Sequence, residues 1–145
     1  MTVPVAAAAR PHTDAVAAAL TAAEVLVGRG IQPDGSGWQG DPGRSEHRRY
    51  VVLYPGAGLV DGSVAVPTEY LVYSCQFTCV AASQPMAEGL ADIVKSLFVG
   101  QLLAVEGRAS YRGQLLLDRP AARDDQVAPP VHYSVTQIGW RTQAA

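Results

Sequence analysis

The segment Tyr70–Ala81, YLVYSCQFTCVA, is the clearest β-strand in the sequence, and the other elements can be placed around it. Polar and apolar residues alternate along it with the period of two that places successive side chains on opposite faces of a sheet. Ser74, Gln76 and Thr78 share one face. The other face carries Leu71, Tyr73, Cys75, Phe77 and Cys79. We therefore expect a long strand with one face buried.

A shorter strand precedes this one. Tyr50–Tyr54 is β-branched and aromatic, and Pro55-Gly56 ends it. The Gly-rich stretch that continues to about Val66 predicts a hairpin tip, so the two strands should pair antiparallel. Gly56-Ala57-Gly58 opens like a dinucleotide-binding loop, but the third glycine comes one place late and a strand follows instead of a helix. We interpret the stretch as a turn.

Two amphipathic helices are predicted. The first runs from about Thr13, a candidate cap, to Val27, and its apolar residues are spaced for one buried face. The second is capped by Ser83, has Pro85 in its first turn and ends at Gly100. Its apolar stripe is wide enough to cover one face of the sheet. We expect residues 1–12 to form a flexible N-terminal arm.

The last third of the chain is predicted to be β. Strands at 102–106 and 114–118 flank two glycines and suggest a hairpin, and a charged, Pro-containing loop covers 119–130. The last strand, 131–141, changes the parity of its apolar residues, which indicates either a bulge near Gln137 or Gly139 or a strand used on both faces. The resulting order is α-β-β-α-β-β-β. We expect one α+β domain over 1–145, with a mainly antiparallel sheet and two flanking helices.

Between the first helix and the first strand, residues 28–49 contain six glycines and two prolines, with Trp38 in the middle. This composition predicts a long loop with a short extended piece around Ile31. The loop closes on the basic run Arg44–Arg49, RSEHRR. Such a run is typical of a solvated approach to a strand, and nucleic-acid contact is the alternative.

The charge balance excludes binding driven by bulk charge. Eleven basic and thirteen acidic residues give a net charge of −2, whereas proteins held to nucleic acid or anionic lipid carry a basic excess. The longest charge-free run, 70–87, is interrupted by polar residues and Pro85, so no membrane span is predicted. The N-terminus lacks the early positive charge of a secretory signal. We expect a soluble protein that is made in the cytoplasm.

The residues that could carry chemistry are not spaced for it. Cys75 and Cys79 lie four apart on one strand face, about 13 Å at about 3.3 Å per residue, too far for a disulfide, which spans at most about 7 Å. His12, His47 and His132 have no metal-ligand spacing. No serine or cysteine has the context of a nucleophile elbow. We predict no enzyme activity, no cofactor and no metal.

The carboxy-terminal third resembles a known family. It contains an Arg-Pro at Arg119-Pro120, the run Arg123-Asp124-Asp125, and Pro129-Pro130 before a Tyr-containing strand that ends at Gln137. In this order and spacing the motifs resemble the tail terminator proteins of siphophages and actinobacterial prophages. Upstream, 50–55 and 77–80 are similar in kind and position, so the resemblance covers about 49–142.

The resemblance implies a structural role. Such proteins form a ring, typically of six copies, at the head-proximal end of the tail tube, where they stop tube growth and present a surface for head joining. The implied partners are copies of the chain itself, the tail tube protein and a neck or head-completion protein, with genomic DNA passing through the ring without specific binding. The implied location is the virion tail, after assembly in the host cytoplasm. Another neck or tail tube structural protein is the first alternative, and a small-ligand-binding domain or enzyme is the second.

Two sets of residues are candidate interface residues. Arg119, Arg123, Asp124 and Asp125 place charges of both signs on a Pro-stiffened loop, where they could pair with a neighbouring copy. Solvated loop charges are the alternative interpretation. The second set is the predicted hairpin tip, with Gly56, Gly58 and Asp61.

Overall fold

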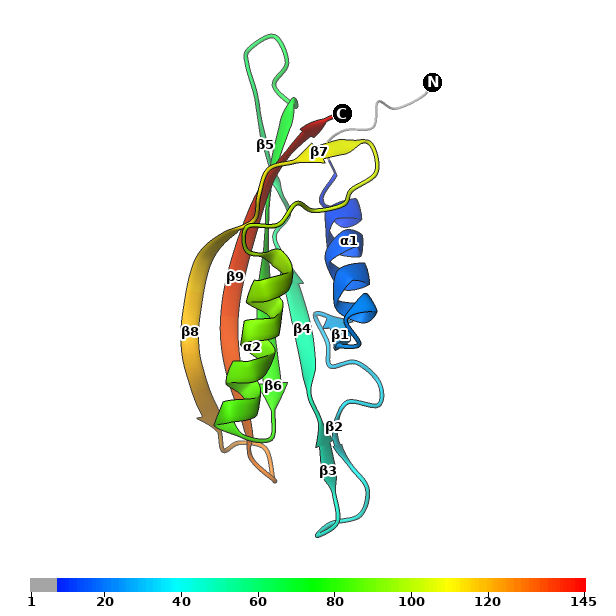
Figure 1. Ribbon diagram of the computed structural model, residues 1–145, viewed down its shortest axis with the longest axis vertical. Helices are drawn as coiled ribbons and strands as arrows, with labels where there is room; N and C mark the ends of the chain where they lie inside the picture. The colour runs from blue at the N-terminus through cyan, green and yellow to red at the C-terminus, as the bar shows by residue number, and fades with distance from the viewer. Residues whose placement is uncertain (1–7) are drawn as a thin grey trace.

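The computed structural model describes residues 8–145 as an elongated molecule built on one long sheet that carries two helices (Figure 1). The architecture confirms the predicted α+β class. The elements are α1 (Ala9–Ala22), β1 (Leu26–Arg29), β2 (Gly37–Gln39), β3 (Glu46–Arg48), β4 (Tyr50–Pro55), β5 (Leu59–Asp61), β6 (Tyr70–Ala81), α2 (Gln84–Phe98), β7 (Arg108–Ser110), β8 (Gln114–Asp124) and β9 (Val131–Ala144).

Strand β6 lies at the centre of the sheet. It pairs antiparallel with β4 on one side, as predicted, and along its whole length with β9 on the other, from Tyr70 opposite Gln143 to Ala81 opposite His132. The order through the sheet is β1-β4-β6-β9-β7, with β1 parallel to β4. In addition, β5 pairs with the start of β6, and β8 pairs with β9. The sheet is therefore mainly antiparallel.

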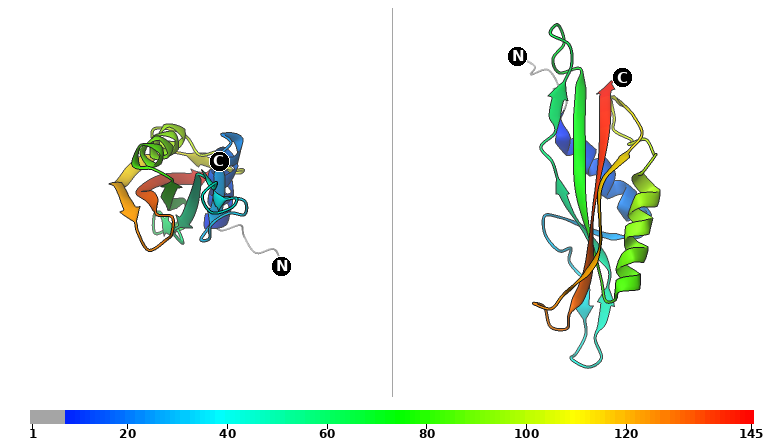
Figure 2. Two further views of the ribbon diagram at one scale, coloured as in Figure 1. Left: turned by 90° about the horizontal axis from the view of Figure 1, so that it is seen from below. Right: turned by 90° about the vertical axis from the view of Figure 1, so that its left-hand side faces the viewer.

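The predicted inner face of β6 is buried. Its five apolar side chains, from Leu71 to Cys79, are each at most 1% exposed. Both helices contribute to the core that covers this face, and Figure 2 shows them beside the curled sheet. Phe98 of α2 lies against Phe77 and Trp140, with ring centroids 5.2 Å and 5.6 Å apart. Aromatic contacts of this kind add to the stabilisation that burial provides.

Helix α1 differs from its prediction at both ends. It begins at Ala9, so residues 9–12 form its first turn and do not belong to an arm, while residues 1–7 of the expected arm lie outside the described residues. Thr13 is therefore inside the helix and does not cap it. The helix ends at Ala22 because Glu24 adopts a φ of 61° and the Val25 and Glu24 amides bond back to Leu20 and Thr21.

The first turn of α1 is held by buried polar contacts. His12 is 1% exposed, and its Nδ1 and Nε2 lie 2.7 Å from the Ala8 carbonyl and the Thr142 hydroxyl. A carbonyl only accepts, so Nδ1 donates to Ala8 and Nε2 accepts from Thr142. Thr13 places its hydroxyl 2.7 Å from that of Tyr73. These contacts fix α1 to the sheet at both β9 and β6.

The expected loop over 28–49 contains more structure than predicted. Its first two residues complete β1, and β2 and β3 form a separate antiparallel hairpin with Trp38 opposite His47. The rings of Trp38 and His47 meet edge to face at 5.1 Å between centroids. Figure 1 shows this hairpin at the lower end of the molecule. Residues 46–48 of the basic run 44–49 thus form the second strand of a hairpin.

The predictions for the last third of the chain are also partly wrong. Residues 102–106 form no strand, and β7 follows them. Strand β8 continues to Asp124, so the predicted loop shrinks to the turn before β9. The irregularities lie in β8, at Leu115–Leu117 and Arg119–Ala122, while β9 pairs with β6 without a break. The apolar parity of β9 changes because its inward positions include the buried polar residues Ser134 and Thr136.

Helix α2 forms as predicted. Its N-cap is Ser83, whose hydroxyl accepts a hydrogen bond from the Met86 amide at 3.4 Å, and Pro85 lies in the first turn. The helix ends one residue before Val99, close to the predicted stop at Gly100. Its buried residues are Ala87, Leu90, Ala91, Val94 and Phe98.

Candidate interaction surfaces

The structure does not bring the two predicted sets of interface residues together. Arg119, Arg123 and Asp124 lie on β8 and Asp125 in the turn that follows, whereas Gly56, Gly58 and Asp61 lie in and before β5. Figure 1 places the end of β8 and the start of the β5–β6 hairpin at opposite ends of the long axis. Each set therefore has to be considered as a separate surface.

Two residues of the charged set pair with each other. Arg123 and Asp125 form an ion pair at 2.5 Å, although both side chains are well exposed. The Asp124 carboxylate accepts a hydrogen bond from the Gln126 amide at 3.0 Å, which shapes the turn. Arg119 is exposed beside the irregular part of β8. An exposed pair contributes about 0–1 kcal/mol, so Arg123 and Asp125 can exchange partners at low cost.

The glycine set shapes the approach to the hairpin. The Gly56 amide donates to the Ser74 carbonyl at 2.8 Å, and Gly58 has a φ of +83° with its backbone close to Leu71. Asp61 pairs with Arg141 at 3.2 Å, and the Arg141 guanidinium lies 4.0 Å from the centroid of the Tyr70 ring. These residues anchor the base of the hairpin. The predicted turn is confirmed, but its tip lies further along the chain.

That tip is an apolar surface that overlaps the predicted hairpin tip 56–66, although the sequence analysis chose Gly56, Gly58 and Asp61 there and not the valines. We call residues 62–69, between β5 and β6, the tip loop. Val64 is fully exposed and Val66 is half exposed, and Leu59 and Val60 in the adjoining strand are exposed as well. Apolar side chains grouped at a projecting end are typical of a contact surface.

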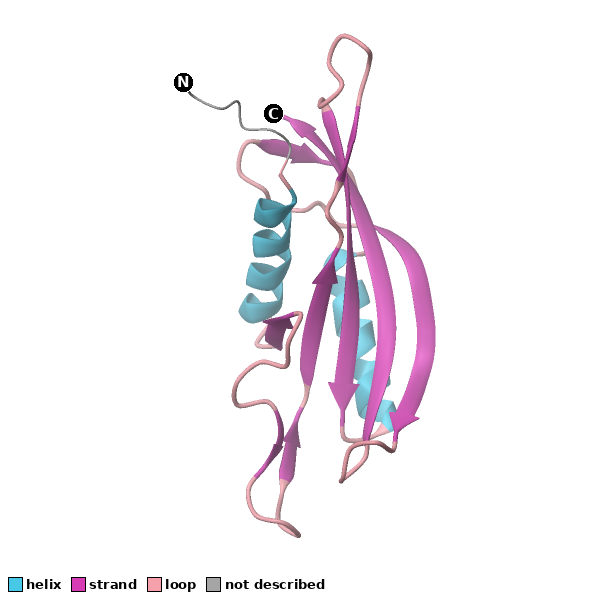
Figure 3. Ribbon diagram, turned by 180° about the vertical axis from the view of Figure 1, so that it is seen from behind, coloured by secondary structure: helices cyan, strands magenta, loops and turns pink. Residues whose placement is uncertain are grey.

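Figure 3 shows β6, β8 and β9 from the side opposite α2. A hollow on this face is bordered by Val72 and Ser74 of β6 and Gly139 of β9. We call it the outer groove. Its volume is about 650 Å³, and Arg112 and Arg141 stand among the residues that border it. A Cβ on Gly139 would come within 2.8 Å of the Leu116 side chain, so that glycine lets Leu116 lie across β9. The lining of the groove includes Gly56, Leu59, Val72, Ser74, Leu116 and Gly139.

A second hollow of about 320 Å³ lies towards the other end of the sheet and includes Trp38, His47, Tyr50 and Asp124 in its lining. Trp38 donates its indole N–H to the Pro129 carbonyl at 3.2 Å, which ties the β2–β3 hairpin to the turn after β8. Burial lowers the pKa of His47 below its usual value and raises that of Tyr50. We interpret this hollow as a gap left where the base of the β2–β3 hairpin packs on the sheet.

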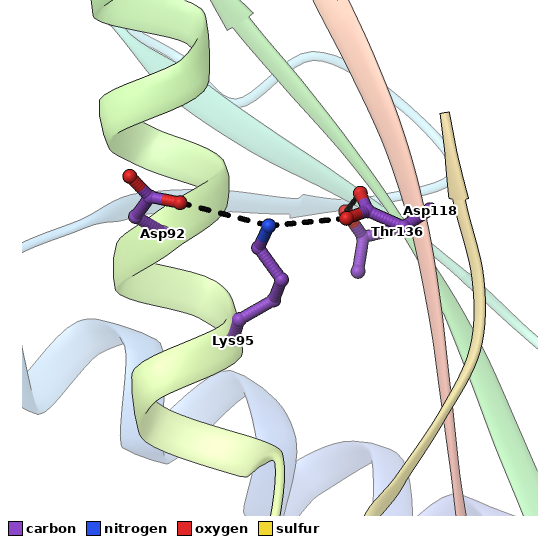
Figure 4. A network of polar contacts seen from close by, with 4 residues as sticks. All are labelled: Asp92, Lys95, Asp118 and Thr136. Atoms are coloured by element: carbon purple, nitrogen blue, oxygen red, sulfur yellow. Dashed lines mark hydrogen bonds and ion pairs between the residues drawn. The ribbon is translucent and has the colours of Figure 1, made fainter. Parts of the chain in front are cut away.

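Lys95, the single lysine in the sequence, links α2 to β8 (Figure 4). Its ammonium group lies 3.1 Å from Asp118 and 3.6 Å from Asp92. Asp118 also accepts a hydrogen bond from Thr136 at 3.3 Å. The hydrogen bond from Lys95 to Asp118 is the main cause of its raised pKa. These contacts hold the edge strand against the helix.

The cysteines and His12 are buried parts of the core and its hydrogen bonds. Cys75 and Cys79 are free and fully buried, and burial raises the pKa of both thiols to about 12. A thiol with such a pKa stays protonated and unreactive near neutral pH. Burial likewise lowers the pKa of His12. Within residues 8–145, no three His, Cys, Asp or Glu side chains are grouped so that they could hold a metal ion.

A comparison with solved structures finds the same fold in a virus-like particle. The chain superposes on one chain of the virion of a native gene transfer agent particle with a TM-score of 0.59 and 18% sequence identity. The superposition covers 95% of this chain and 93% of that chain. At this identity the likeness establishes a shared fold. No family model and no curated protein matches the sequence.

Neither helix among the described residues is long and apolar enough to cross a membrane.

Proposed function

We propose that this chain is a structural protein of a phage-like virion, in which copies of it form a ring at the head-proximal end of the tail tube. The observation that carries the proposal is the likeness of fold, over nearly the whole of both chains, to a chain of a gene transfer agent virion. The sequence motifs between Arg119 and Gln137 add the resemblance to tail terminators. In this role the ring ends tube growth and offers a surface for head joining.

The shape of the molecule supports such a role. Hairpins project at both ends of the long axis, the β5–β6 hairpin at one end and β2–β3 at the other (Figure 1). We propose that a subunit with this shape uses different surfaces for the tail tube, for a neck or head-completion protein and for its neighbours. A ring results when head-to-tail contacts between copies close after a fixed number, and we propose six.

The charged set is a candidate for contacts around this ring. In the monomer Arg123 pairs with Asp125, and an equivalent pairing across a subunit boundary would exchange one exposed ion pair for another. Such an exchange contributes orientation more than affinity. The net charge of −2 carries no basic excess, in keeping with a ring through which genomic DNA passes without specific binding.

Deletion of the gene from the phage or particle that encodes it tests the proposal. A tail terminator predicts tails of uncontrolled length that do not join heads, with rescue by the wild-type gene. Tails of normal length that fail to join heads would instead identify another neck protein, the alternative from the sequence analysis. Absence of any tail would indicate a tube subunit. Normal, infectious particles would refute a structural role altogether.

A further inference from the structure

The tip loop and the outer groove are complementary surfaces on the same molecule. The tip loop presents Val64 and Val66 beyond the end of the sheet, whereas the groove is an open, mainly apolar hollow beside Leu116. Burying such side chains removes apolar area from water and drives association. In Figures 1 and 3 the loop points along the long axis, away from the body of the sheet. The tip loop therefore does not fill the groove of its own chain.

The tip loop and the outer groove also carry charges of opposite sign. Residues 62–69 include Glu69 and no basic residue. Arg112 stands at the groove, with one guanidinium nitrogen bonded to the Gly100 carbonyl at 2.8 Å and further N–H groups available. Arg141 is already paired with Asp61 and adds little net charge. The tip loop thus carries one carboxylate, at the end that adjoins β6, and the apolar groove has Arg112 at its border.

The sheet edges are less suited to joining copies. Strand β1 has four residues, and β8 has two register shifts in its pairing with β9 and contains Pro120, which has no backbone N–H. Short strands, prolines and bulges are the features that prevent a strand from adding to an edge. The projecting tip loop, with its exposed valines, is better suited than β1 and β8 to contact between copies.

We propose that the tip loop of one copy inserts into the outer groove of the next copy, with Val64 in the hollow beside Leu116. The inference rests on the proposed ring and names the contact that would join its subunits. The two surfaces are different patches of one chain, so the contact is head-to-tail, which is the type that can close into a ring.

Disulfide trapping between two single-cysteine variants tests this contact. V64C places a thiol on the tip loop and L116C places one in the groove, at positions that are both solvent-exposed in the monomer. Cys75 and Cys79 are fully buried and do not compete. The control partner is V127C, also exposed but in the turn between β8 and β9. Thermal unfolding of each variant verifies that it is folded.

The two variants are mixed and oxidised over a concentration series. We expect the V64C–L116C heterodimer to form at least tenfold faster than the V64C–V127C heterodimer. Equal rates for the two pairs would overturn the proposal. Protection of L116C from alkylation in purified particles, without enriched crosslinking to V64C, would assign the groove to a different occupant and would also overturn it.

These results separate the contact from the proposed function. Enriched crosslinking together with normal tails after gene deletion would support the tip-to-groove contact and refute the terminator role. Overlong tails after deletion without enriched crosslinking would support the terminator role and refute the contact.

Discussion

Thr13 gives a direct test of how α1 is fixed to the sheet. The residue is only 5% exposed, and its hydroxyl lies 2.7 Å from that of the fully buried Tyr73. Replacing Thr13 by Val keeps the shape but takes away the partner of the Tyr73 hydroxyl. Leaving a buried polar group unsatisfied costs about 1–3 kcal/mol. For a domain of this size, the melting temperature falls by roughly 2–4 °C for each kcal/mol.

A double-mutant cycle assigns this cost to the pair. The free energies of unfolding of the Thr13→Val, Tyr73→Phe and double variants are measured by urea denaturation followed by circular dichroism. Because the double variant leaves neither hydroxyl buried alone, it should be more stable than the sum of the single effects predicts, by about 0.5–3 kcal/mol. Thr21→Val is the matched control, since Thr21 is exposed on the same helix and should change stability by less than about 0.5 kcal/mol.

The reasoning would be refuted if Thr13→Val cost no more than Thr21→Val, or if the cycle showed no coupling. The variant Thr13→Asn distinguishes a buried Thr13 inside α1 from the N-cap that the sequence predicted. At an N-cap, Asn is as favourable as Thr. At the buried position inside α1, a larger amide side chain has to be destabilising, so Asn should be worse than Val.

Three further predictions concern stability. Gly58→Ala should lower the free energy of unfolding, measured by urea denaturation, by about 1–2 kcal/mol, because a left-handed residue gains a Cβ that would lie 2.9 Å from the Leu71 side chain. Gly89→Ala has open space around its added Cβ and should raise the free energy of unfolding by about 0.5–1 kcal/mol. Equal effects of the two substitutions would contradict this local geometry. Lys95→Met should cost no more than about 1 kcal/mol, since its carboxylate partners are partly exposed, and a larger loss on denaturation would mean that the link to β8 is more deeply buried. Because burial lowers the pKa of His12, protonation is favoured in the unfolded chain, so stability should fall as the pH drops below about 6.5; His12→Gln should remove part of this decline, and identical pH profiles for the two proteins would show that His12 does not titrate on unfolding.

The sequence predicted the central strand well because β6 is buried on one face along its whole length. An alternating pattern then follows directly from the period of two. Strand β9 shows the limit of this rule. Its inward positions include Ser134 and Thr136, and Thr136 is bonded to Asp118 of β8. In a sequence, a polar residue that is buried against a partner on another strand looks like an exposed residue. The apparent change of parity in β9 therefore comes from tertiary contacts, which the local sequence does not show.

Element boundaries were missed where local signals were weak. The alanine-rich start of α1 has similar helix propensity over many positions. The helix ends at Ala22, and the left-handed residue that follows its end is Glu24, where a glycine is the usual signal. The strand predicted at 102–106 rested on the two glycines between it and 114–118, and in the structure Leu103 and Val105 are buried without forming a strand. The Leu103 amide donates to the Ser110 hydroxyl and not to a strand partner.

The candidate surfaces could be predicted only in part. The charges at Arg123 and Asp125 were recognisable because they are only two positions apart in the sequence, although their pairing with each other was not. The outer groove combines residues near Gly56, Leu116 and Gly139, which come together only through the sheet. The exposed valines of the tip loop were a usable signal, since apolar residues in a Gly- and Pro-containing turn have no core to enter.

The most direct test of the proposed role is the position of this chain in the assembled particle. Electron microscopy of purified particles labelled with an antibody fragment against the chain would show it. The proposed role predicts one band of label at the junction of head and tail, and no label on particles from the gene deletion. Label along the whole tube, on the head shell or on no part of the particle would contradict it.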